Sequence, residues 1–194
     1  MLRRALCALF VVALASCRTA PVHEGAAQSW DSRRPQLQSL ERFELKGRVA
    51  VAAGGEGFNA RLRWSQVGSR TNMSLDGPLG TGGVQVTSDG SALSVVTSNG
   101  QHMDSDAARS ELRSRLGFDP PLSSLRYWIL GVPEPGPPAQ ESLDPQQRLA
   151  TLQQNGWQIS YTDYTAVDGG WRPSKLTLQR DNVRVRVVVD GWNS

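Results

Sequence analysis

Apolar residues recur at every second position over long stretches of this chain. The first stretch runs from Phe43 to Val51 and the second from Phe58 to Trp64, with polar residues between the apolar ones. Shorter stretches with the same alternation follow, around Met73 and Leu75, Val84 and Val86, and Leu93 and Val95. A period of two indicates strands that have one apolar and one polar face.

Dipeptides that favour hairpin turns separate these stretches: Gly54-Gly55, Asp76-Gly77, Asp89-Gly90 and Asn99-Gly100. The pattern therefore predicts an antiparallel meander. Four more strands are predicted in the last third of the chain: Arg148–Gln153, Trp157–Tyr164, Lys175–Gln179 and Val183–Val189.

Helical periodicity appears before and between these two blocks of strands. A first helix is predicted around Trp30–Leu40, and Pro35 requires that it either start nearby or kink. Ala108, Leu112 and Leu116 share one face of a second helix that Gly117 ends. A third helix is predicted over Leu122–Leu130, closed by Gly131, and an extended loop over Pro133–Pro138.

Eight or more strands in two blocks can curl around one small ligand, whereas a flat sheet would leave too much apolar surface uncovered. We therefore predict a mainly β (α+β) fold. Its architecture is an open, half-closed antiparallel β-barrel with helices covering the apolar concavity.

The N-terminus carries export and anchoring signals. Arg3 and Arg4 precede the apolar run Ala5–Leu14, which is shorter than the roughly 20 residues that span a bilayer and fits a signal peptide. Leu14-Ala15-Ser16-Cys17 resembles a lipobox, in which the cysteine is lipidated and the preceding bond is cut. The alternative is a secretory signal with an incidental cysteine.

These signals divide the chain into three parts. Residues 1–16 are predicted to be a removed signal peptide, residues 17–29 a lipidated cysteine with a flexible tether, and residues 30–194 a single domain. Cys7 would leave with the signal peptide and Cys17 would be blocked by lipid, so no disulfide is expected. In enterobacterial lipoproteins an aspartate after the cysteine favours the inner membrane, and Arg18 points instead to the outer membrane.

Charge and motifs exclude several classes of function. The chain has 21 Lys and Arg against 18 Asp and Glu, and loss of residues 1–16 leaves 19 against 18, with no basic run. We therefore expect no nucleic-acid binding. The sequence has two histidines, His23 and His102, and no HExxH, phosphate loop or G-x-S-x-G motif. We expect no enzyme, no metal and no cofactor.

Two features leave alternatives open at this point. Leu79 is the one large apolar residue among the turn formers of the segment Asp76–Gly83. It either folds back onto the core or protrudes as a finger that touches a membrane or partner. Trp64 and Trp128 lie on apolar faces, where they either fill the core or line a lipid-sized cavity.

The chain resembles the LolB family of outer-membrane lipoproteins. The resemblance rests on the lipobox that ends at Cys17, on Pro78-Leu79-Gly80 between strands, and above all on the segment Ser124–Gly131, SLRYWILG. It implies a half-barrel that receives lipoproteins from a LolA-like periplasmic carrier and inserts them into the outer membrane. It also implies that Leu79 is the membrane-insertion loop residue.

The implied partners are the carrier, lipidated cargo proteins and outer-membrane lipid, and we expect a monomer held at the outer membrane and facing the periplasm. The alternative is a lipoprotein that binds lipid or another apolar ligand without inserting cargo. Inward positions of the strands and of the third helix are the candidates for an acyl-chain cavity: Val49, Val51, Leu62, Trp64, Met73, Leu75, Val84, Val86, Leu125, Trp128 and Ile129.

Overall fold

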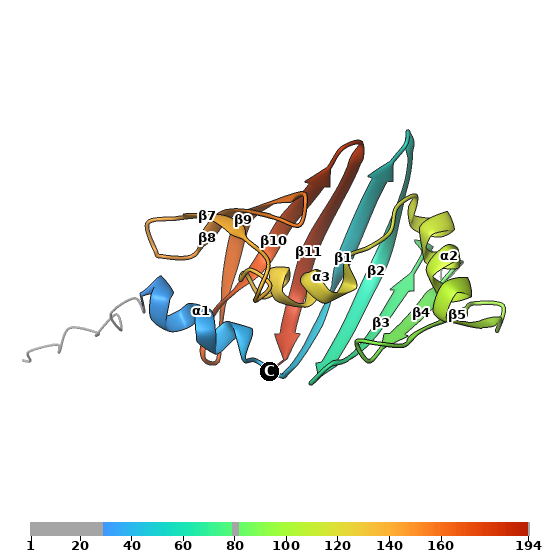
Figure 1. The fold of residues 1–194 in the computed structure, drawn as a ribbon, viewed down its shortest axis with the longest axis horizontal. Coiled ribbons are helices and arrows are strands. Elements are labelled where there is room, and N and C mark those ends of the chain that lie inside the picture. Colours follow the sequence, from blue (N-terminus) through green and yellow to red (C-terminus); the bar gives the residue numbers. More distant parts are fainter. Residues whose placement is uncertain (1–28, 79–81, 194) are drawn as a thin grey trace, which may run out of the picture.

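A computed structural model describes residues 29–78 and 82–193 of the chain (Figure 1). Within these ranges, eleven antiparallel strands form one sheet and three helices accompany it. The predicted signal peptide, Cys17 and Leu79 lie outside the described residues.

The sheet is a continuous ladder in which the two ends of the domain meet. Its spatial order is β6-β5-β4-β3-β2-β1-β11-β10-β9-β8-β7, so the first and last strands pair at its centre. The first block of strands is β1 (Arg42–Ala53), β2 (Glu56–Val67), β3 (Arg70–Asp76), β4 (Val84–Ser88), β5 (Leu93–Thr97) and β6 (His102–Asp104). The second block is β7 (Ala139–Leu143), β8 (Leu149–Gln154), β9 (Trp157–Val167), β10 (Gly170–Arg180) and β11 (Val183–Asn193).

Side chains alternate between a buried and an exposed face along the central strands. In β1, Phe43, Leu45, Val49 and Val51 are buried. The residues that alternate with them at the start of the strand are exposed: Arg42, Glu44, Lys46 and Arg48. In β11, Val183, Val185, Val187 and Val189 are buried in the same way. The predicted period of two is therefore confirmed for both blocks.

The sheet curves but does not close. β6 and β7 are its two edges and do not pair with each other, and all three helices lie on the same side of it in Figure 1. This confirms the predicted open, half-closed architecture. The described strands form an open sheet and not a closed β-barrel. Between residues 29 and 193, no described helix is long and apolar enough to cross a bilayer.

Two short edge strands, β6 and β7, escaped prediction. β6 has only three residues, and the alternating positions of β7 are partly buried or exposed, so neither has a marked apolar face. The connection between β3 and β4 spans residues 77–83, so the turn predicted at Asp76-Gly77 is longer than a tight hairpin turn.

The helices match their predicted places and differ in their ends. α1 (Trp30–Gln38) starts five residues before Pro35 and runs through it. α2 (Ser105–Leu116) ends at Gly117, whose φ of 76° is left-handed as predicted. α3 (Leu122–Trp128) is shorter than predicted, and Ile129 to Gly131 form turns after it.

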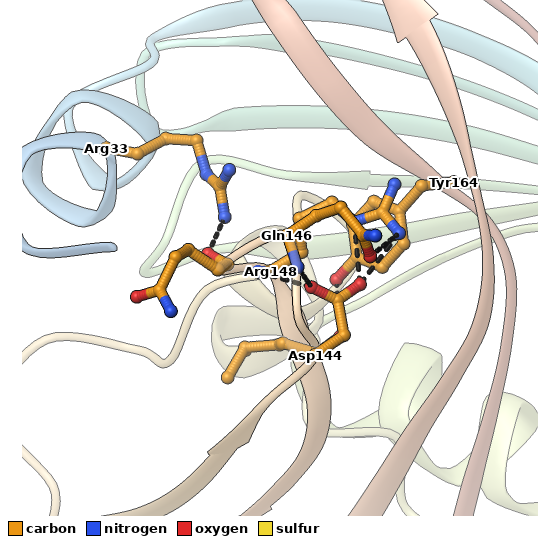
Figure 2. Close-up of polar contacts among 7 residues, drawn as sticks. Arg33, Asp144, Gln146, Arg148 and Tyr164 are labelled. Carbon is orange, nitrogen blue, oxygen red and sulfur yellow. Dashed lines mark hydrogen bonds and ion pairs between the residues drawn. The ribbon is translucent and has the colours of Figure 1, made fainter. Parts of the chain in front are cut away.

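A polar cluster fastens α1 to the turn between β7 and β8 (Figure 2). Arg33, a residue only 6% exposed, donates a hydrogen bond from its guanidinium to the Gln147 carbonyl. Burial lowers the pKa of Arg33. In the same turn Arg148 forms an ion pair with Asp144 at 2.7 Å and lies over the Tyr164 ring at 4.5 Å. α1 is thus tied to the second block of strands.

Candidate functional site

An apolar cavity lies between the concave face of the sheet and the two helices α2 and α3. Its volume is about 100 Å³. Every residue that lines it is apolar: Val49, Val51, Phe58, Leu62, Trp64, Met73, Leu75, Val86, Leu112, Leu116, Phe118, Pro120, Leu122, Leu125, Ile129, Leu176, Leu178, Val185 and Val187. Such a surface offers no hydrogen bond and favours a purely hydrocarbon occupant.

Nine of the eleven candidate cavity residues line this space, and Val84 and Trp128 do not. Val84 packs in a second cluster, which includes Val95, Ala108 and Leu112. Trp128 is fully buried, with its ring 6.4 Å from that of Trp157. Trp128 therefore fills the core, the first of the two alternatives that the sequence left open, and does not line the cavity.

Several lining residues were missed. Leu176 and Leu178 in β10, with Val185 and Val187 in β11, lie on the inward phase of the second block. Their alternation was visible in the sequence. What was not visible is that β11 lies directly beside β1, which brings both blocks around one space.

A hydrogen-bond network holds the C-terminal end of α3. Trp128 Nε1 donates to Gln154 Oε1 at 2.8 Å. Gln154 Nε2 donates in turn to the carbonyls of Glu134 and Pro137, at 2.9 and 3.1 Å. Gln154 is 3% exposed. These hydrogen bonds therefore satisfy the oxygen and the nitrogen of its buried amide group.

Tyr161 adds a second tie to the same end of α3. Its hydroxyl donates to the Trp128 carbonyl at 2.9 Å. Burial raises the pKa of Tyr161 well above its usual range, so the phenol stays neutral and remains a donor. Trp128 is therefore held at both its side chain and its backbone.

The other end of α3 borders an open polar groove of about 660 Å³. Leu112, Pro120 and Leu122 line both the groove and the cavity, so the two spaces adjoin. Charged side chains in the groove are Arg109, Arg126, Arg180, Asp119 and Glu134. A ligand with an apolar and a polar part could place each part in a matching environment.

The cavity is small for an acyl chain. Sites that enclose drug-sized ligands have about 300–1,000 Å³, several times the volume enclosed here. Occupation by a long chain therefore requires α2, α3 or the residues between them to move away from the sheet. Hydrogen bonds hold α3 on both sides of its midpoint, at Trp128 near its C-terminus and at Ser124 near its N-terminus.

The segment that contains Leu79 is held on both sides. Before it, Asp76 forms an ion pair with Arg63 at 2.8 Å. After it, Ser98 N donates to the Gly83 carbonyl at 2.9 Å, and Arg115 Nη1 donates to the Gly82 carbonyl at 3.3 Å. Arg115 belongs to α2, which also lines the cavity through Leu112 and Leu116.

His102 does not form a catalytic relay. Its Nε2 lies 3.1 Å from Asp104 Oδ2 and 3.4 Å from Ser94 Oγ. A relay needs the serine and the carboxylate on different ring nitrogens, whereas here both meet the same one, and the His102 side chain is 60% exposed. Residues 29–78 and 82–193 also hold no group of three or more His, Cys, Asp or Glu that could bind a metal.

Comparison with known proteins shows the family. The family model described as outer membrane lipoprotein LolB matches residues 41–192. The chain belongs to the LolB family. The outer-membrane lipoprotein LolB of Nitrosococcus oceani is 37% identical over 166 residues, which are 85% of this chain and 83% of that protein. LolB of Pseudomonas aeruginosa strain LESB58 is 32% identical, over 98% of this chain and 96% of that protein.

Membership of the LolB family confirms the predicted resemblance and the prediction that this chain is not an enzyme. Solved structures add the fold. A LolA superfamily protein from Nitrosomonas europaea has a TM-score of 0.54 at 9% identity, over 86% of this chain and 93% of that one. A DUF1329 family protein from Desulfovibrio piger has a TM-score of 0.56 at 8% identity, over 84% and 90% of the two chains.

Proposed function

We propose that this LolB-family protein is a lipid-anchored receptor on the periplasmic side of the outer membrane. It accepts lipoproteins from a LolA-like carrier and inserts them into the membrane. The observation that carries the proposal is the cavity between the sheet and α2 and α3, whose lining is entirely apolar. The adjoining polar groove supports it, because a lipoprotein has a polar polypeptide attached to its acyl chains.

The free energy of hydration explains why such a receptor is needed. Each CH₂ that leaves water gains about 0.8 kcal/mol, so exposing one chain of about sixteen carbons costs roughly 12 kcal/mol. A cargo with several chains costs a multiple of this. Transfer must therefore run from one apolar site to another and then into the bilayer, without an aqueous intermediate.

Two parts of the proposal concern residues outside the described ranges. Lipid on Cys17 keeps the domain at the receiving membrane, within reach of the tether at residues 17–29. Leu79 enters the bilayer and opens a path for the cargo. The fixed ends of its segment, at Asp76 and Gly83, support this role because they hold the segment at a defined place on the domain.

A transfer assay on the chain from residue 17 with Cys17→Ser tests the receptor role and the role of Leu79. We expect this unlipidated chain to take lipidated cargo from the carrier and to deliver it to vesicles. Leu79→Glu keeps acceptance and loses most insertion, because a carboxylate is costly to bury in a bilayer. Val187→Trp lowers acceptance, because the indole occupies part of a cavity of about 100 Å³.

The matched control for Leu79→Glu is Val67→Glu. Val67 is an apolar residue next to a turn, 51% exposed, and it lies outside the segment that contains Leu79. The finger role is wrong if Leu79→Glu inserts cargo as well as Val67→Glu does. The receptor role is wrong if the unlipidated chain takes no cargo, and retention of cargo without delivery would favour a lipid-binding protein that does not insert.

A further inference from the structure

Three arginines gather on the outer face of the sheet, the face opposite α2 and α3. Arg48 of β1, Arg61 of β2 and Arg186 of β11 are all exposed. Arg48 lies directly opposite Arg61 in the β1–β2 ladder, and Arg186 lies opposite Ala50, two residues further along β1. We call these three residues the outer arginine cluster.

The cluster surrounds a hollow of about 370 Å³ on this face. Its floor is made by small or short side chains, among them Ala50 and Val188. Gly77 and Pro78, the first residues of the β3–β4 connection, form another part of its wall. Three arginine side chains thus border an open depression beside Gly77 and Pro78, just before Leu79 in the chain.

The charge of the cluster is only partly compensated. Arg48 pairs with Asp190 at 2.8 Å. Asp76 also borders the hollow and lies opposite Arg61, but its carboxylate is bound by Arg63 at 2.8 Å and by Ser74 at 3.1 Å. Across the described parts of the chain, no ion pair involves Arg61 or Arg186.

Two arginines directly opposite each other in a sheet destabilise it. A solvated outer face has no need of that arrangement, since any polar residue would serve there. Guanidinium groups around a hollow match phosphate oxygens in charge and in hydrogen-bonding geometry. The favoured ligand is therefore a phosphate-bearing group.

We propose that the outer arginine cluster binds the phosphates of anionic lipid headgroups when the domain meets the membrane. The inference deepens the proposed function and rests on its placement of Leu79 in the bilayer. Pro78 precedes Leu79 by one residue, a step of about 3.8 Å between their Cα atoms. The headgroup layer is roughly 5–7 Å thick on each side, so the wall of the hollow lies at headgroup depth when Leu79 is inserted.

Vesicle binding tests the proposal, again with the chain from residue 17 and Cys17→Ser. The probes are vesicles of phosphatidylcholine alone and vesicles with about one third phosphatidylglycerol. We expect Arg61→Ser/Arg186→Ser to bind the anionic vesicles roughly thirtyfold more weakly, since each arginine at an anionic surface contributes about a factor of five. The wild-type preference for anionic vesicles should fall with added salt.

The matched control is Arg42→Ser/Arg70→Ser, which removes the same charge from the same face. Both arginines are exposed and align with Val67 at the other end of β1, β2 and β3. The control should keep anionic-vesicle binding within about twofold of wild type. Equal losses in the two double variants would overturn the proposal in favour of a general effect of net charge.

Two other outcomes also decide. If Arg61→Ser/Arg186→Ser binds anionic vesicles like wild type but binds the carrier more weakly, the cluster recognises an acidic protein and the proposal is wrong. The proposed function is tested separately by cargo acceptance and by Leu79→Glu. Failure of cargo acceptance with a specific loss in Arg61→Ser/Arg186→Ser would overturn the receptor role and leave the lipid site in place.

Discussion

Tyr161 and Tyr164 are the two tyrosines whose phenols are buried beneath the region that holds α3. Tyr161 donates to the Trp128 carbonyl at 2.9 Å, and Tyr164 donates to the Leu149 carbonyl at 2.7 Å. Burial is the main cause that raises the pKa of each of them above its usual value of 10.0. Each hydroxyl must therefore stay protonated to keep its hydrogen bond to the carbonyl.

This burial predicts a loss of stability at alkaline pH. In the unfolded chain both tyrosines release protons as the pH rises past 10, while in the folded chain they keep them. The free energy of unfolding contributed by this difference is fully present below pH 10 and falls as the pH rises above it. Urea denaturation between about pH 9 and 12 measures the fall.

The double variant Tyr161→Phe/Tyr164→Phe is the control for this prediction. It starts from a lower stability, because two carbonyls each lose the hydrogen bond from a tyrosine hydroxyl. Its free energy of unfolding should nevertheless fall less over the same pH range. An equally steep fall in the double variant would show that other groups cause it.

α3 shows how a short element is placed by its ends. Its seven residues are too few for an independently stable helix, and the contacts at Trp128 and at the turn after it decide where it lies. Gly131 in that turn has a φ of 78°. A Cβ there would lie 3.0 Å from Pro173 Cγ and 3.2 Å from the Tyr164 hydroxyl oxygen. The turn therefore requires glycine for both its backbone and its close packing.

We predict that Gly131→Ala lowers the free energy of unfolding by about 2–3 kcal/mol, from backbone strain and from overpacking. Gly169→Ala separates the two causes. Gly169 has a φ of 82° and no atom within 4 Å of its added Cβ, so it should cost only about 1 kcal/mol. Urea denaturation of both variants measures the difference, and equal costs would contradict the packing argument.

At the scale of the whole molecule, the pairing of β1 with β11 joins two blocks of strands into one concave surface. The ladder is irregular at Lys46 and Gly47. A Cβ on Gly47 would lie 2.3 Å from the Val188 carbonyl oxygen. The join therefore depends on a backbone approach that leaves no room for a side chain.

We predict that Gly47→Ala costs about 3 kcal/mol of unfolding free energy, at the upper end for overpacking, because the strand backbones must separate. Gly191→Ala is the matched control. Gly191 lies in β11 opposite Lys46, and nothing is within 4 Å of its added Cβ, so it should change stability by less than about 0.5 kcal/mol. A similar cost in both variants, measured by urea denaturation, would contradict the close-approach argument.

The predicted and observed folds agree where local pattern is sufficient. Alternation placed the strands, and Gly117 placed the end of α2, because each depends on neighbours within a few residues. The edge strands β6 and β7 escaped because their side chains have no consistently buried face. Trp128 and Val84 were wrongly placed at the cavity, because the sequence shows that a residue lies on an apolar face but not which apolar surface that face packs against.

By itself, the sequence determined the antiparallel fold class, the family resemblance and nine of the residues that line the cavity. These follow from periodicity and from short motifs. Only the tertiary structure decided that β11 lies beside β1, that Leu178 and Val187 complete the cavity, and that Arg48, Arg61 and Arg186 surround one hollow. The physical reason is that register and closure depend on contacts between residues more than a hundred positions apart, and no local pattern records them.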